Sequence, residues 1–222
     1  MSEWRQVEDP KVWASRFPRF LDIVYFDWVS VGKKIAFIHA SQDRLEEIGN
    51  DIAPKALVYE DHQKVPAATA DAFKINDGLR VISSALRDVL VQFDMTGVQL
   101  FEVPIFADKD GTPSGLPNHY VLNVYGSKDA LIPELSENIQ KRVLTLLGRT
   151  EPLPNAKWSP KKSLDVVALS ASAGDGPDLW RDPNYDDTLF FSDRLKRAID
   201  AAGLKTKALS FAATRVFVAD GR

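Results

Sequence analysis

Two segments with strand character, residues 98–106 and 119–125, are separated by a stretch rich in turn residues. The first contains Pro104, which has no backbone N–H to donate to a ladder and therefore indicates an edge strand or a bulged one. Between the segments, Asp108-Lys109-Asp110-Gly111 has the composition of a tight turn. The pattern predicts a long antiparallel hairpin, so at least part of the chain must form an antiparallel sheet.

Two amphipathic helices are predicted, one before this hairpin and one well after it. Between Leu79 and Phe93, apolar residues recur at spacings of three and four, which places them on one helix face. A second helix is predicted over Asp193–Ala202, with Ser192 as its N-cap and Gly203 at its end. Strands and helices do not alternate regularly. We therefore expect an α+β fold, with mostly antiparallel sheet and these helices packed on it.

The other segments give weaker signals. Strands are predicted over residues 22–31, 35–38, 164–169, 188–191 and 208–218, and a short helix over 43–48. Pro133 can start a helix whose apolar face would include Leu135, Ile139 and Val143, and a strand over the last third of that segment is the competing interpretation. Prolines at 152, 154 and 160 indicate a linker.

Cysteine is absent from the 222 residues, which excludes disulfides, thiolate metal sites and cysteine nucleophiles. The three histidines, His39, His62 and His119, have no second ligand at the spacing that a metal-binding helix requires. No glycine-rich loop joins a strand to a helix in the manner of a phosphate-binding site. We therefore expect neither a tightly bound metal nor an organic cofactor.

No catalytic motif is recognisable in the sequence. The segment Gly111–Gly115 has the wrong spacing for a G-x-S-x-G nucleophile turn, and the residues around Asp108 lack the further ligands of a calcium loop. A Ser–His–Asp group assembled only by folding stays open, because such groups need not be close in sequence. An enzyme with a dispersed, hydrolase-like active site is therefore one alternative.

The N-terminal residues lack the apolar core of a secretory signal, and no apolar run reaches the ~18 residues of a membrane span. The absence of cysteine fits a reducing compartment. With 28 Lys and Arg against 31 Asp and Glu, the formal net charge is −3, whereas nucleic-acid binders usually carry a basic excess. We expect a cytoplasmic protein that contacts neither membrane nor nucleic acid directly. The oligomeric state is left open.

One acidic segment, residues 172–187, stands out as a candidate partner-binding loop. Its candidate residues are Asp175, Asp178, Trp180, Arg181, Asp182, Tyr185, Asp186 and Asp187. Aromatic residues and arginine are enriched at protein interfaces, and clustered aspartates steer a basic partner. We expect Trp180 or Tyr185 to anchor such a partner. The alternative is a solvated loop whose Trp180 packs on the protein's own core.

Several of these segments resemble a known bacterial family. The residues that carry the resemblance are Asp178–Asp182, Leu189–Leu195 and Ala201–Leu204, together with Tyr120–Val124, Asp129-Ala130, Ser136, the helix Leu79–Leu90 and Phe101–Pro104. Over roughly residues 55–218, the chain is similar to family eleven of the immunity proteins of bacterial polymorphic toxin systems. The resemblance implies a protein that neutralises a cognate toxin by direct binding, without catalytic residues of its own.

The resemblance also implies a division of the chain, with an N-terminal segment at 1–54 and an immunity-protein-like domain at 55–222, or one continuous domain. A general protein-interaction module without toxin specificity is a further alternative. The neighbouring gene would separate these hypotheses, because a toxin gene favours an immunity protein and a metabolic operon favours an enzyme.

Overall fold

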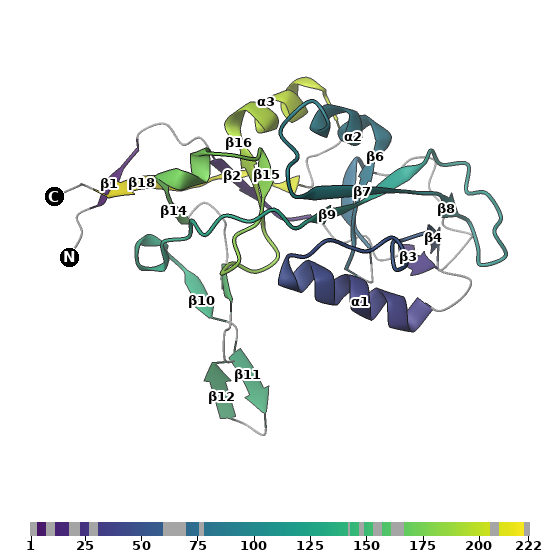
Figure 1. Ribbon diagram of the computed structural model, residues 1–222, viewed down its shortest axis with the longest axis horizontal. Helices are drawn as coiled ribbons and strands as arrows, with labels where there is room; N and C mark the ends of the chain where they lie inside the picture. Colours follow the sequence, from purple (N-terminus) through teal and green to yellow (C-terminus); the bar gives the residue numbers. More distant parts are fainter. Residues whose placement is uncertain are drawn as a thin grey trace. The chain divides into compact units, whose positions relative to one another are not determined.

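The protein is described from a computed structural model (Figure 1). The structure describes residues 4–7, 12–17, 23–26, 31–59, 70–75, 78–141, 143–146, 149–152, 157–160, 167–204 and 209–219. The chain forms two compact units, each built from separated stretches. The first unit comprises Met1–Arg16, Gly126–Lys196 and Phe211–Arg222, and the second comprises Phe17–Tyr125 and Arg197–Ser210. The predicted division at residue 54 stays a prediction.

The second unit is built around a four-stranded antiparallel sheet in the order β5-β6-β9-β7. Its strands are β5 (Ala72–Lys74), β6 (Arg80–Ser83), β9 (His119–Val124) and β7 (Val98–Val103). Strands β7 and β9 pair from Val98 opposite Val124 to Val103 opposite His119. The predicted hairpin is therefore confirmed. Strand β7 lies at the sheet edge and ends before Pro104, as expected for a residue without a backbone N–H.

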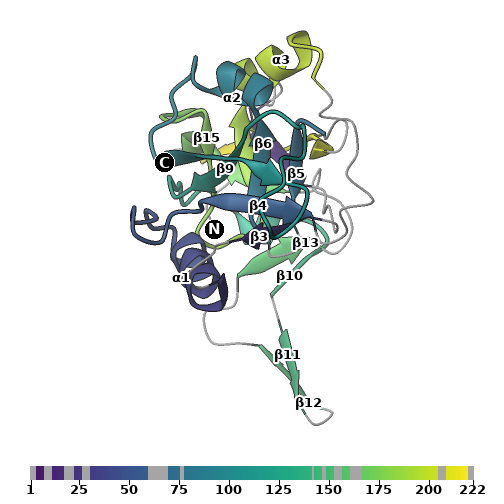
Figure 2. The same ribbon diagram turned by 90° about the vertical axis from the view of Figure 1, so that its right-hand side faces the viewer.

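A smaller sheet and two helices complete the second unit. The sheet has the order β3 (Ile23–Phe26), β4 (Ala56–Tyr59) and β8 (Ile105–Phe106), with an antiparallel first pair and a parallel second pair. Helix α1 spans Val31–Arg44 and helix α2 spans Ser84–Leu90. In both views the two helices lie on opposite sides of β9 (Figures 1 and 2).

Three local predictions in the second unit are wrong. The helix predicted from Leu79 begins only at Ser84, because residues 80–83 form β6 and the side chain of Ser83 accepts the backbone N–H of Leu86 as an N-cap. Residues 35–38 lie in α1 and not in a strand, since a short apolar run does not distinguish the two structures. The short helix predicted over 43–48 is also wrong, since α1 ends at Arg44.

The first unit contains two small sheets and two separate hairpin-like pairs. One sheet has the order β1 (Trp4–Gln6), β18 (Arg215–Ala219) and β14 (Ala168–Ser170), and the other β15 (Leu179–Trp180), β16 (Leu189–Ser192), β2 (Val12–Ser15) and β17 (Ala212–Ala213). Each sheet thus combines strands from both ends of the chain. Of the predicted strand segments, residues 164–166 and 208 lie outside the described part. Helix α3 (Asp193–Ala201) begins in this unit, directly after β16.

The helix predicted from Pro133 is wrong, and its competing interpretation is confirmed. Only Pro133–Leu135 forms a single 3-10 turn, and strands β10 (Ile139–Lys141) and β11 (Val143–Leu146) follow. Strand β10 pairs with β13 (Trp158–Pro160), and β11 pairs with β12 (Arg149–Pro152). In the predicted proline linker, Pro152 ends β12 and Pro160 ends β13, whereas residues 153–156, with Pro154, lie outside the described part.

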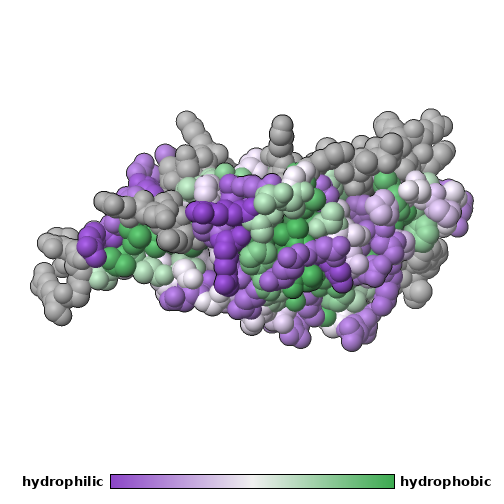
Figure 3. All heavy atoms as spheres, turned by 90° about the horizontal axis from the view of Figure 1, so that it is seen from above, coloured by the Kyte–Doolittle hydropathy of each residue, from purple (hydrophilic) through white to green (hydrophobic). Residues whose placement is uncertain are grey.

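Each unit has its own apolar core. In the second unit the buried cluster includes Ile38, Leu57, Phe73, Val81 and Val121, and in the first unit it includes Val12, Leu169, Trp180, Tyr185 and Phe190. The face shown in Figure 3 alternates between hydrophilic and hydrophobic patches. None of the helices in the described ranges is long and apolar enough to cross a membrane. The α+β fold with mostly antiparallel sheet is confirmed.

The C-terminus of α1 places Leu45 in a conformation that suits glycine. Leu45 has a φ of 58°, its N–H donates to the carbonyl of Gln42, and the N–H of Glu46 donates to the carbonyl of Ser41. These two bonds form a Schellman motif, whose left-handed position glycine usually occupies. A side chain in this region destabilises the backbone by about 1–2 kcal/mol.

We therefore expect Leu45→Gly to be more stable than Leu45→Ala by about 1 kcal/mol, because both remove the side chain but only glycine removes the strain. In thermal unfolding this corresponds to roughly 2–4 °C for a chain of this size. Equal melting temperatures for the two variants would show that the strain is absent.

His119 makes the stability of the protein depend on pH. Burial lowers the pKa of His119 below its ordinary value of 6.5, while the hydrogen bond to the Pro117 carbonyl and the charge of Asp71 oppose this effect. The carbonyl can only accept, so Nδ1 carries the proton and donates across 2.8 Å. As the pH falls below about 6.5, the unfolded chain binds a proton that the folded chain still excludes. The contribution of His119 to the free energy of unfolding is therefore fully present above about pH 6.5 and decreases below it.

We expect the free energy of unfolding to fall between pH 7 and pH 5 by at most about 1.4 kcal/mol per pH unit from this residue. In His119→Asn the amide N–H can still donate to Pro117, but the titration is removed. The difference between the two pH profiles of denaturant unfolding isolates His119 from the other histidines, and parallel profiles would contradict its role.

Candidate partner-binding site

The acidic segment 172–187 is not one open loop. It begins in a 3-10 turn (η3, Ala171–Gly174), continues through strand β15, and turns at residues 181–188 into strand β16. Strands β15 and β16 pair with Leu179 opposite Phe191 and Trp180 opposite Phe190. The backbone of this segment is therefore held at several points by the sheet of the first unit.

Five of the eight predicted partner-binding residues are buried. These are Asp178, Trp180, Arg181, Asp182 and Tyr185, each at most 3% exposed. Trp180 stacks on Phe190 with ring centroids 4.5 Å apart, and Tyr185 packs against the same ring. The alternative left open by the sequence, a core role for Trp180, is the arrangement in the structure. Asp175 is exposed, and Asp186 and Asp187 are partly exposed. Whether these three carboxylates contact a partner stays a prediction.

The buried carboxylate of Asp182 is held by backbone hydrogen bonds. One carboxylate oxygen accepts the backbone N–H groups of Ala130 at 2.9 Å and Leu131 at 2.8 Å, and the other accepts that of Asn184 at 2.8 Å. Burial raises the pKa of Asp182 above its ordinary value, and these three hydrogen bonds oppose the rise. Asp182 therefore ties the turn after β15 to the segment at residues 130–131.

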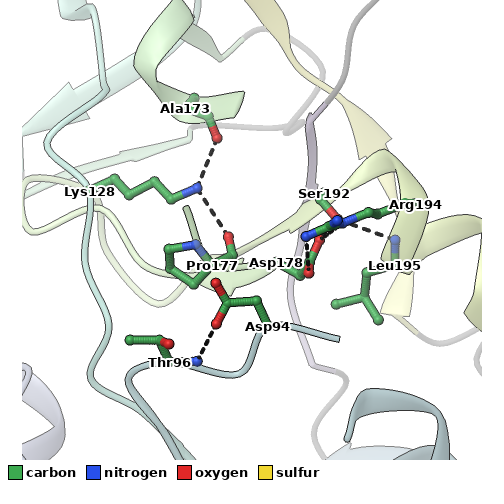
Figure 4. Close-up of polar contacts among 9 residues, drawn as sticks. All are labelled: Asp94, Thr96, Lys128, Ala173, Pro177, Asp178, Ser192, Arg194 and Leu195. Atoms are coloured by element: carbon green, nitrogen blue, oxygen red, sulfur yellow. Dashed lines mark hydrogen bonds and ion pairs between the residues drawn. The ribbon is translucent and has the colours of Figure 1, made fainter. Parts of the chain in front are cut away.

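Asp178 is the second buried carboxylate, and it binds the start of α3. Arg194 donates to it through Nε at 2.6 Å and Nη2 at 2.7 Å, while Ser192 donates its hydroxyl to the same carboxylate (Figure 4). The Ser192 oxygen also accepts the backbone N–H of Leu195 at 3.2 Å, which caps α3. The predicted N-cap role of Ser192 is confirmed, and the same residue links the helix to Asp178.

Lys128 holds the backbone that precedes Asp178. Its ammonium group donates to the carbonyls of Ala173 at 3.0 Å and Pro177 at 3.1 Å (Figure 4). The same group lies 4.9 Å from the centroid of the Trp180 ring. A cation above an indole face is attracted by the ring quadrupole. Lys128 therefore fixes both ends of the segment 173–177, so this segment is held in place although most of it is exposed.

A pocket lies between this segment and the start of α3. Its volume is about 470 Å³, and it is lined by Gly174, Asp175, Gly176, Asp178, Ser192, Asp193 and Arg194. The Arg194 side chain is 67% exposed, although it forms a two-point ion pair with the buried Asp178. Asp193, which also lines the pocket, accepts the indole N–H of Trp13 at 3.0 Å. Three carboxylates and one guanidinium line the pocket, so its side chains carry two negative charges in excess.

Sequence reasoning identified only part of this pocket. It singled out Asp175 and Asp178 for their acidity and missed two further lining residues, Asp193 and Arg194. It also missed Lys128, which holds the neighbouring backbone. What the sequence does not show is the pairing of β15 with β16, which brings Ser192 to Asp178 through a backbone hydrogen bond of 2.9 Å. A two-residue strand leaves no periodic pattern in a sequence, so this contact had no detectable signal.

Within the described part of the chain, no group of three or more His, Asp or Glu side chains could hold a metal ion. The expectation that the protein binds no metal or organic cofactor stays a prediction. Of the three histidines, His119 lies in β9 and His39 in α1, whereas His62 lies outside the described residues.

The fold and the pocket define an α+β protein with a rigid, polar surface site in its first unit. A comparison with protein-family models matches residues 51–214 to the immunity protein family (Imm11). The match covers most of the chain, and the chain therefore belongs to this family. This confirms the resemblance noted in the sequence. A search of curated proteins found no match.

The pairing of Asp178 with Arg194 can be tested by a double-mutant cycle with Asp178→Asn and Arg194→Met. Each single variant leaves a polar group without its charged partner, so we expect a coupling energy of about 1–3 kcal/mol in chemical denaturation. The pair Arg215–Glu137, at 2.7 Å in the same unit, has a carboxylate that is 64% exposed and not buried, so it is a control for which we expect less than about 1 kcal/mol. Additive effects at Asp178 and Arg194 would contradict the structural role of this pair.

Proposed function

We propose that this protein is an immunity protein that neutralises a cognate bacterial toxin by direct protein–protein binding. The observation that carries the proposal is membership of the immunity protein family over residues 51–214. A protein with this role must meet its toxin in the compartment where the toxin would act on its own cell, so we place it in the cytoplasm. It needs no chemistry of its own, because covering the active site of a toxin, or holding the toxin inactive, is sufficient.

The first unit has features that suit such binding. The segment 173–177 is fixed by Lys128, and the exposed guanidinium of Arg194 is fixed by Asp178. Side chains that are already ordered in the free protein lose less conformational entropy on association. We infer that the partly or fully exposed carboxylates Asp175, Asp186 and Asp187 face the toxin and attract a basic surface, as charges at an interface rim do.

The proposal predicts stoichiometric protection. We expect cells that express the toxin gene adjacent to this one to survive only when this protein is co-expressed. With purified proteins, we expect toxin activity to fall linearly with added protein and to reach its minimum at a fixed ratio close to equimolar. The complex should elute as one species in size-exclusion chromatography.

An enzymatic mode of protection gives a different result. A catalyst would inactivate the toxin when present in far less than equimolar amounts, and the toxin recovered afterwards would be covalently altered. Toxin recovered from the complex in denaturant and refolded should instead have unchanged mass and full activity. Protection at trace ratios, or no protection at all, would overturn the proposal.

A further inference from the structure

Strand β7 forms an open edge of the four-stranded sheet in the second unit. Resting on the proposed function, we propose that an extended segment of the toxin pairs with this edge and adds a fifth strand to the sheet. Three features of β7 support this: the direction of its backbone groups, the lack of partners for them within the described chain, and the regular, accessible form of the strand.

Alternate residues of β7 point their backbone N–H and C=O groups away from β9. The N–H of Tyr125 donates to the carbonyl of Gly97 at 2.8 Å, which makes residues 97 and 125 a hydrogen-bonded pair. Such pairs recur at every second residue of an antiparallel ladder, so the odd-numbered residues of β7 bond to β9. The backbone groups of the even-numbered residues Leu100 and Glu102 therefore point outward from the sheet.

The protein itself occupies both ends of this outward row of backbone groups but not its middle. At one end the N–H of Val98 donates to the carbonyl of Met95 at 3.0 Å, and at the other the carbonyl of Pro104 accepts the N–H of Leu57 at 3.0 Å. Between these ends, the outward groups of residues 100 and 102 have no hydrogen-bond partner in the described part of the chain. Two donors and two acceptors are thus available to another chain.

The edge is also regular and accessible. All six residues of β7 pair with β9 without a bulge, and none of them is a lysine or a proline, which protect many edge strands from pairing. Leu100 and Phe101 are partly exposed and Glu102 is exposed, and Figure 1 shows β7 in front of the other strands of its sheet. The opposite edge strand differs, since two of the three residues of β5 are at most 1% exposed.

Strand β7 is held in place before any partner arrives. The side-chain oxygen of Gln99 accepts the backbone N–H of Ile48 at 2.8 Å and an amide N–H of Asn123 at 3.0 Å, and its own amide donates to the carbonyl of Ile48 at 3.2 Å. These bonds use side-chain atoms of β7, so they leave its outward backbone groups unused. A partner that binds a fixed strand loses less conformational entropy than one that must order it.

These backbone groups specify an extended occupant. The outward groups recur every two residues, about 6.6 Å apart, which is the repeat of another β-strand. A helix does not offer this match, because its backbone groups bond to one another. Side chains of the incoming segment would lie beside Leu100 on one face of the sheet and beside Phe101 on the other, so we expect apolar residues at those positions.

Hydrogen exchange of single amides, measured on the isotopically labelled full chain, tests the pairing. In the free chain we expect the N–H groups of Leu100 and Glu102 to exchange about a hundredfold faster than those of Gln99 and Phe101, which bond to β9. Saturation with the toxin should slow the first pair to the rates of the second. Equal rates in the free chain, or unchanged rates in a complex that forms, would overturn the inference.

Proline at the edge provides the matched comparison. Glu102→Pro removes an outward N–H and keeps the ladder with β9, whereas Glu102→Thr keeps that N–H. Both variants lose the charge and the 2.7 Å hydrogen bond from Asn118, so the backbone donor distinguishes them. We expect both to fold with a cooperative melting transition. The affinity for the toxin should be at least about tenfold lower for the proline variant, because a toxin carbonyl is left without its donor. Equal affinities would contradict the pairing.

A second copy of this chain is the competing occupant of the edge. Without toxin, protection of Leu100 and Glu102 that grows with protein concentration, together with a dimer mass in light scattering, would assign the edge to self-association and overturn the inference. A toxin complex whose edge amides stay unprotected removes only the inference and leaves the proposed function intact. If the chain binds no toxin at all, the proposed function fails and the inference fails with it.

Discussion

Two buried carboxylates, Asp178 and Asp182, hold the first unit together. A carboxylate removed from water is strongly destabilising unless charged or backbone donors replace the lost hydration. Asp182 is matched by three backbone N–H groups, and Asp178 by a guanidinium and a hydroxyl. Because those donors come from residues 130–131, 184, 192 and 194, each carboxylate can be satisfied only when these separated segments are in place. Trp180 lies between the two in the sequence and packs into the core of this unit.

This arrangement explains why the acidic segment was only partly interpretable from the sequence. Five aspartates within a short stretch have the composition of a solvated or partner-facing loop. Two of them are buried, because backbone N–H groups donate to Asp182, and the Ser192 hydroxyl and the Arg194 guanidinium donate to Asp178. The sequence shows the residue type but not the donors around it. Trp180 and Tyr185 were therefore interpretable either as anchors for a partner or as core residues.

The fold was predictable where local signals agree with each other. The β7–β9 hairpin combined strand-forming segments, turn residues and a proline at the strand end, and α3 had both an N-cap and a terminal glycine. Prediction failed where local and tertiary preferences differ. Residues 35–38 have strand-like composition but lie in α1, whereas residues 139–141 and 143–146 have helical spacing but form β10 and β11. Whether such a segment forms a helix or a strand depends on the neighbouring strands that it can pair with, and a single sequence does not show which strands these are.

The net charge of −3 gives a poor measure of what this surface attracts. An ion pair such as Asp178–Arg194 contributes no net charge, yet it determines the shape and rigidity of the pocket beside it. Exposed charges separated by more than about 8 Å are largely screened at physiological ionic strength, so a partner responds to the nearby groups.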